Sequence, residues 1–236
     1  MRSLIAYFLR SYTFSQRYFA PVAGTLIAVL ILYSYKPNPV MNSYAASAVM
    51  LFVGCSWLGL SFLNHQQAVQ RQVAVVHLRS AVKHSIGEML TMGVLTLLLS
   101  LVIVLYPIVT GNFSDPVGGY RLFLALAGHA LLGFLGIAIS LYLQSSWVSK
   151  NSYAAGSMLI IITLSIGGTK LQELVPGPVM PILLPPVSPV MDALMNADDL
   201  PASSLLGSFA HALAYISVLI CFYLYRTSRM DVNKNL

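Results

Sequence analysis

The chain has 236 residues, of which 57% are hydrophobic and only 8% are charged. An average soluble domain carries roughly 25% charged residues, so this composition excludes a soluble enzyme, a disordered protein and a nucleic-acid-binding domain. The formal net charge of +6 is no nucleic-acid footprint, because the basic residues fall between apolar runs. We therefore expect an all-α integral membrane protein that forms a single transmembrane domain over 1–236.

Residues 1–17 predict an amphipathic helix that lies in the membrane interface. Five apolar side chains share one arc at about 100° per residue: Leu4, Ile5, Phe8, Leu9 and Tyr12. Arg2 and Arg10 fall opposite this arc and, with Arg17, would lie among the lipid headgroups. A frayed, basic N-terminus is the alternative. No clean small-residue cleavage site follows the next apolar run, so we expect no cleaved signal.

Six apolar segments approach the roughly 20 residues that an α-helix needs to cross a hydrocarbon core of about 30 Å. They cover 19–35, 41–63, 86–106, 122–143, 153–168 and 205–225. With both termini in the cytosol, only Lys36, Arg121 and Lys170 lie outside, so ten of the 13 basic residues lie inside. This excess sets the orientation. Tyr33 and Tyr44, at predicted outer ends, are expected at headgroup level.

Residues 64–85 form a long cytosolic connection that contains no Gly or Pro. Val69, Val73 and Val76 recur in it at helical spacing, with Arg71, Arg79 and Lys83 among them. Two interpretations remain open. The segment is either an extension that docks on a partner or a solvated or interfacial helix that joins two spans.

The outer connection, 169–204, is rich in proline. It holds seven of the 12 prolines: Pro176, Pro178, Pro181, Pro185, Pro186, Pro189 and Pro201. Proline removes a helix donor, so a straight spanning helix is not expected here. Because 179–191 is mostly apolar, we expect a re-entrant or interfacial hairpin, which is tolerated at membrane depth where it is buried in protein or lines a cavity. An apolar loop on the membrane surface is the alternative.

The sequence shows no motif of a catalytic or metal site. A P-loop, an H-E-x-x-H and a C-x-x-C are all missing, so we expect neither an enzyme nor a cofactor bound by this chain. Cys55 and Cys221 both lie in apolar stretches and indicate no disulfide framework. Glu88 is the only acid near a span, which weakens the case for an ion-coupled carrier.

Two histidines lie inside predicted spans, each about two helical turns from the outer end. His129 and His211 would form a polar spot on a substrate path or a proton-sensitive gate. The alternative is a neutral imidazole that is hydrogen-bonded between helices. Gly128, Gly133 and Gly136 lie in the same span as His129 and predict close helix packing.

This organisation resembles the ABC-2 family, the permease subunits of ATP-binding-cassette exporters, in its small six-span bacterial form. The string RQVAVVHLRSAVKHSIGEML at 71–90 is similar to the family's stretch from the coupling helix into the third span. The string VPGPVMPILLPPVSPVMDAL at 175–194 is similar to its re-entrant region. The family often carries acidic residues at the start of the cytosolic loop, where this chain has NHQQ at 64–67.

The resemblance implies half of a transmembrane pathway in a bacterial plasma membrane. It implies a second permease copy and a separate ATPase subunit that binds ATP and Mg. The ATPase would contact 64–85 through Arg71, His77, Arg79 and Lys83, although the basic residues would serve equally well to bind anionic lipid headgroups. The outer gate would consist of Pro176, Pro178, Pro181, Pro185 and Pro186. The cargo would be an antimicrobial or other toxic peptide, a drug or a lipid-like molecule.

Two other classes of function stay open. A non-transporting immunity or peptide-binding membrane protein would have no ATPase partner. A small secondary carrier or channel would work without ATP and would depend on His129 or His211. A membrane-embedded enzyme has least support, because the sequence shows no nucleophile–base pair.

Overall fold

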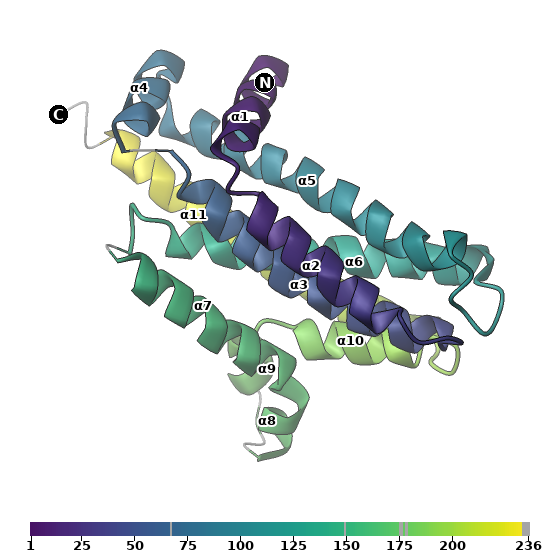
Figure 1. Cartoon of the computed structure of the whole chain (residues 1–236). Helices are drawn as coiled ribbons and strands as arrows, with labels where there is room; N and C mark the ends of the chain where they lie inside the picture. Colours follow the sequence, from purple (N-terminus) through teal and green to yellow (C-terminus); the bar gives the residue numbers. More distant parts are fainter. Residues whose placement is uncertain (67, 149, 175–176, 178, 233–236) are drawn as a thin grey trace.

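The computed structural model describes residues 1–66, 68–148, 150–174, 177 and 179–232. Within these ranges every regular element is a helix, apart from an isolated backbone bridge between Asn38 and Phe113. The elements in chain order are α1 (Arg2–Ser15), α2 (Phe19–Leu32), α3 (Val40–Leu63), α4 (Ala68–Leu78), α5 (Ala81–Val109), α6 (Gly118–Ser140), the 3₁₀ turn η1 (Leu141–Leu143), α7 (Asn151–Ile166), α8 (Gly168–Leu174), α9 (Val179–Leu183), α10 (Val187–Met195) and α11 (Ala202–Val232) (Figure 1). The expected all-α fold is confirmed.

Four helices are long and apolar enough to cross a membrane, which indicates a membrane protein. They are Val40–Leu63, Ala81–Val109, Gly118–Leu143 and Ala202–Arg229. These helices coincide with the second, third, fourth and sixth predicted spans. The third begins at Ala81 rather than at Ile86, because the Ser80 hydroxyl accepts a hydrogen bond from the Lys83 N–H at 3.2 Å and caps the helix there. The connection predicted over 64–85 is therefore shorter than expected.

The first and fifth predicted spans are short helices next to sharp bends. α2 has 14 residues and α7 has 16. At 1.5 Å per residue they are about 21 Å and 24 Å long, less than a hydrocarbon core of about 30 Å. α1 turns from α2 by 81°, and α8 turns from α7 by 70°. The chain thus has four candidate spans, or up to six if each bent pair counts as one.

α3 and α6 form the centre of the bundle. The buried share of their apolar windows is 61% and 67%, against 33% for α5 and 17% for α11. The two central helices approach each other closely at glycines. A Cβ atom on Gly136 would lie 2.7 Å from the Phe52 carbonyl oxygen of α3. The close packing predicted from the glycines is confirmed.

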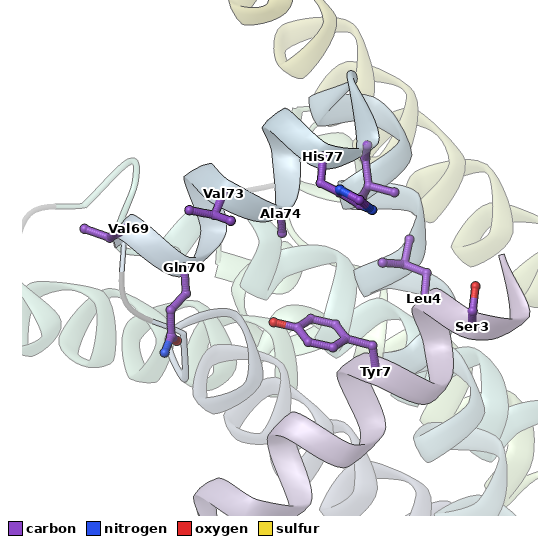
Figure 2. Close-up of a pocket in the computed structure, with 9 residues that line it drawn as sticks. Ser3, Leu4, Tyr7, Val69, Gln70, Val73, Ala74 and His77 are labelled. Atoms are coloured by element: carbon purple, nitrogen blue, oxygen red, sulfur yellow. The ribbon is translucent and has the colours of Figure 1, made fainter.

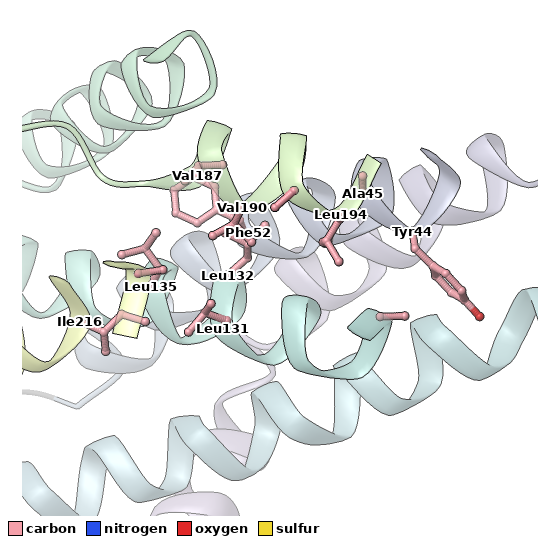
Figure 3. Packing of buried hydrophobic residues seen from close by; sticks show 14 of the residues in the cluster. Tyr44, Ala45, Phe52, Leu131, Leu132, Leu135, Val187, Val190, Leu194 and Ile216 are labelled. Atoms are coloured by element: carbon pink, nitrogen blue, oxygen red, sulfur yellow. The ribbon is translucent and has the colours of Figure 1, made fainter. Parts of the chain in front are cut away.

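The proline-rich connection forms three short helices, α8, α9 and α10, as its prolines predict. α10 packs against α3, α6 and α11 in the main core (Figure 3). Its residues Val187, Val190 and Leu194 are fully buried, so α10 is enclosed by protein rather than laid on the surface.

The predicted gate prolines are distributed unevenly over this connection. Pro185 and Pro186 are buried at the start of α10, and Pro181 lies half-buried in α9. Pro176 and Pro178 lie outside the described residues. The prolines at the start of α10 are therefore part of the core, and a gating role for any of the five stays a prediction.

α1 is the helix expected over 1–17, but protein rather than lipid covers much of its apolar arc. Phe8 and Tyr12 are buried against α5 and the end of α3. The Phe8 ring lies edge-on to Phe62, with 6.1 Å between the ring centroids. Arg2 and Arg10 remain exposed on the opposite side. The arc that the sequence assigns to the membrane therefore fixes α1 to the bundle.

Candidate functional site: a polar network beneath α4

Polar side chains from four segments meet at the end of the bundle that carries α1 and α4, which we call the α4 end (Figure 1). We call these side chains the polar network: Arg71, His84, Ser85, Glu88, Gln144, Ser146 and Tyr223. They come from α4, α5, the connection after η1 and α11. Most of them are buried, so their hydrogen bonds and charges are only weakly screened by water.

Arg71 joins α4 to the rest of the network. Its Nη1 donates to Gln144 Oε1 at 2.7 Å, and its Nη2 lies 3.5 Å from Oε2 of Glu88. The Arg71 side chain is 22% exposed, whereas that of Glu88 is 5% exposed. A buried carboxylate is strongly unfavourable unless it is paired. Glu88 on the spanning helix α5 therefore depends on a cation from α4.

His84 contacts both the Glu88 carboxylate and α1. It lies one helical turn before Glu88, and its Nδ1 is 3.4 Å from Glu88 Oε2. Its ring is fully buried and packs edge-on to the Phe8 ring of α1 at a centroid distance of 5.1 Å. Within the described part of the chain, neither ring nitrogen has a hydrogen bond of good geometry.

Tyr223 extends the network to α11. Gln144 Nε2 donates to the Tyr223 hydroxyl at 3.2 Å, and this hydroxyl also lies 3.2 Å from Ser85 Oγ. Close by, the Tyr142 hydroxyl donates to the Leu219 carbonyl of α11. Arg71, Gln144 and Tyr223 thus form a chain of contacts from α4 to α11.

The turn between α4 and α5 explains how these residues meet. Arg79 has a φ of 54°, in the left-handed region that few non-glycine residues adopt. Ser80 then caps α5. The chain reverses direction at this point, which returns Arg71 to the side of Glu88.

The other residues predicted to contact an ATPase lie at the surface. His77 is exposed on α4, where it faces α1 (Figure 2), and Arg79 and Lys83 are exposed at the turn that follows. The structure therefore places Arg71 inside the bundle and leaves these three side chains accessible. The ATPase contact stays a prediction for all four, and Arg71 has an internal role that its sequence context did not indicate.

Of the three N-terminal arginines, Arg17, in the turn between α1 and α2, has a structural role. Its Nη1 donates to the Asn64 carbonyl at 2.7 Å, and Ser61 Oγ donates to the Arg17 carbonyl at 3.0 Å. These bonds fix the α1–α2 turn to the end of α3. Arg10 lies over the Phe14 ring, 5.5 Å from its centroid. Both Arg10 and Arg2 are exposed.

The two span histidines have different surroundings. His129 is fully buried between α3 and α6, where its Nδ1 donates to the Ala125 carbonyl at 2.7 Å and its Nε2 accepts from Ser47 Oγ at 2.9 Å. This geometry is that of a neutral imidazole hydrogen-bonded between helices. His211 lies half-buried on α11. A place on a substrate path stays a prediction for both.

Sequence reasoning missed most of the polar network. Gln144 and Tyr223 are ordinary residues at helix ends, and only their spatial neighbours give them a role. One signal was present, because Glu88 is the only acid near a predicted span and such acids need a partner. The described residues contain no cluster of three or more His, Cys, Asp or Glu side chains that could hold a metal ion.

The fold indicates a helical membrane protein in which a small helix, α4, is attached to the candidate spans. No family model, curated protein or solved structure matched the chain. Its function is therefore argued from the geometry of the chain itself.

Proposed function

We propose that the chain is the membrane-spanning permease subunit of an ABC-2-type exporter. The attachment of α4 carries this proposal. α4 lies outside the candidate spans, and Arg71 links it to Glu88 on α5 and, through Gln144 and Tyr223, to α11. A permease needs such an element, because a partner that moves it also moves the helices around the pathway.

In this proposal the chain crosses a bacterial plasma membrane six times, with both termini in the cytoplasm. α2 and α7 provide the first and fifth spans, and α1 lies at the cytoplasmic interface. α8, α9 and α10 form a re-entrant segment at the outer end, which the burial of α10 supports. An ion pair between Arg121 at the start of α6 and Asp198 beyond α10, at 2.9 Å, helps to hold this segment.

A separate ATPase subunit would bind ATP and Mg and would dock on the accessible surface of α4 and the following turn. Val76 is 76% exposed there, and an exposed apolar side chain of this kind is typical of a contact surface. Arg79 and Lys83 lie beside it. This chain would hold no ATP or Mg itself.

A second permease copy would complete the pathway. α11 is the least buried of the four long helices, with 17% of its apolar window inside the structure. The spans carry few charges, so a pathway between two copies would be largely apolar. This lining favours an amphipathic or hydrophobic cargo, such as a toxic peptide, a drug or a lipid-like molecule.

Co-purification from the native membrane tests the proposal. The wild-type chain is compared with Arg79→Glu/Lys83→Glu, which changes the expected docking surface but leaves the polar network intact. Lys150→Glu/Arg229→Glu is the matched control, because it makes the same charge change at exposed residues outside α4 and the following turn. We expect a P-loop ATPase to co-purify with the wild type and the control but not with the first variant. Absence of an ATPase from all three preparations would refute the exporter.

A further inference from the structure

A groove of about 570 Å³ separates α1 from α4 (Figure 2). This volume lies within the range of small-molecule sites, about 300–1,000 Å³. Leu4 and Tyr7 of α1 line one side, and Val73, Ala74 and His77 of α4 line the other. The groove lies on the outside of the bundle and is distinct from the polar network on the inner side of α4.

The groove combines apolar walls with a few polar groups. Val69 and Val73 lie on the projecting helix α4 and are 66% and 64% exposed. Ser3 and His77 provide polar groups beside them. Apolar surface of this kind needs a cover, and the mixture suits a molecule with an apolar body and a polar head.

Positive charge flanks the groove and has no ion-pair partner among the described residues. Arg2 and Arg10 are exposed on α1, one residue before Ser3 and three after Tyr7. The ion pairs within the described residues are made by other cations: Arg71, His84, Arg121 and Lys170. Charge complementarity therefore favours an anionic head for the occupant.

The direction of α1 places the groove where lipid is available. α1 turns from α2 by 81°, so it runs across the bundle rather than along it. Figure 1 shows α1 and α4 projecting side by side from the same end. Because α2 is the predicted first span, a helix at this angle to it runs along the membrane surface, and its exposed arginines then lie near the headgroups. Headgroups and the upper parts of acyl chains are its natural neighbours there.

We propose that the α1–α4 groove binds an anionic phospholipid. The phosphate lies beside Arg2 and Arg10, and the apolar part covers Tyr7 and Val73. The site requires only that the chain lies in a membrane, so it does not depend on the exporter proposed above. It makes the position of α4 responsive to the composition of the surrounding leaflet.

Lipid titration of the purified full chain tests the charge requirement. The chain, in an uncharged detergent, is titrated with phosphatidylglycerol or phosphatidylcholine of the same acyl composition, and bound lipids are counted by native mass spectrometry. One basic residue near a lipid surface changes affinity about fivefold. We therefore expect Arg2→Gln/Arg10→Gln to weaken phosphatidylglycerol binding about 25-fold, while Lys150→Gln/Arg229→Gln leaves it unchanged. Equal binding of the two lipids by the wild type would overturn the proposal.

A pair of tryptophan variants tests the groove itself. Val73→Trp fills it, whereas Val76→Trp adds the same side chain to α4 outside the lining. We expect only Val73→Trp to abolish the saturable binding of phosphatidylglycerol. If Val73→Trp instead keeps the lipid and loses the ATPase, the groove belongs to the ATPase and the lipid site is wrong. If no ATPase co-purifies with the wild type but the lipid binds as expected, the exporter fails and the lipid site stands.

Discussion

Replacing Gly136 with alanine tests the close approach of α3 and α6 that forms the centre of the bundle. A Cβ atom at this position would lie 2.7 Å from the Phe52 carbonyl oxygen and 3.0 Å from the Ser56 backbone nitrogen. Ordinary contact begins at 3.4 Å. These two atoms belong to the backbone of α3, and the third obstructing atom, Ser56 Oγ, lies at 2.7 Å. A change of the Ser56 rotamer would remove only the third contact. The two helices must separate.

The size of the effect follows from two opposing terms. Overpacking of a close-packed core costs about 1–3 kcal/mol, and a rigid backbone obstacle between the two most buried helices places this substitution near the upper value. A gap of about 0.5–1 Å also forfeits a quarter to a half of each dispersion contact. Alanine is favoured over glycine in a helix by about 1 kcal/mol. We expect Gly136→Ala to lower the free energy of unfolding by about 2 kcal/mol.

Gly207→Ala is the matched control, because a Cβ atom on Gly207 of α11 meets no atom within 4 Å. Only the helix-propensity term remains there, so this variant should be more stable than the wild type by about 0.5–1 kcal/mol. Both are measured by unfolding the purified protein in mixed micelles with rising SDS fraction, followed by circular dichroism. Equal stability of the two variants would show that α3 and α6 are not in close contact at Gly136.

Three further predictions concern polar contacts. Arg71→Met leaves the buried Glu88 carboxylate without its arginine and should lower the free energy of unfolding by about 3 kcal/mol. Glu88→Gln leaves a partly exposed guanidinium and should lower it by about 1 kcal/mol. Equal losses in SDS unfolding would contradict this asymmetry. Burial lowers the pKa of His65 below its ordinary value of 6.5, so its stabilising contribution is complete above that pH and is lost as the pH falls. The protection of α1 amides, taken as their exchange rate relative to the intrinsic rate at each pH, should therefore decrease as the pH falls below 6.5, and His65→Gln should remove this change. Ser47→Ala leaves His129 Nε2 without its donor and should cost about 1–2 kcal/mol; no loss would show that the imidazole has another partner.

The long spanning helices could be predicted from the sequence because hydropathy and length determine them almost alone. α3, α5, α6 and α11 each combine more than 20 residues with high mean hydropathy. The glycine-rich face of α6 was predictable for a similar reason, since a small residue inside a membrane helix has little use except close packing.

The short elements could not be predicted to the same precision. α2 and α7 lie in apolar runs of nearly sufficient length, and only the bends of 81° and 70° show how the chain continues. Tyr33 and Tyr44, which the sequence places at headgroup level, are buried in protein, and their depth in the membrane stays a prediction. The Tyr44 hydroxyl donates to the Val104 carbonyl of α5 at 3.1 Å. A tyrosine at a helix end suits either place, and tertiary contacts decide between them.

The polar network was out of reach because its members are distant in sequence. Gln144 and Arg71 share no periodic pattern, and their contact depends on the left-handed backbone of Arg79 and the cap at Ser80. A basic residue in a polar connection such as 64–85 is also expected at the surface. Arg71 points inward because the Glu88 carboxylate of α5 lies within reach of its guanidinium.

The most closely packed helices of the bundle, α3 and α6, are distinct from its least buried long helix, α11. α3 and α6 are joined by backbone contacts at glycine and cannot separate without loss of the core. α11 is largely uncovered, and Tyr223 ties its α4 end to the polar network. In the proposed exporter, a displacement of α4 would be passed through Arg71 to α5 and α11. In the proposed exporter, α5 and α11 would be the helices that move when the ATPase closes, and α3 and α6 the frame against which they move.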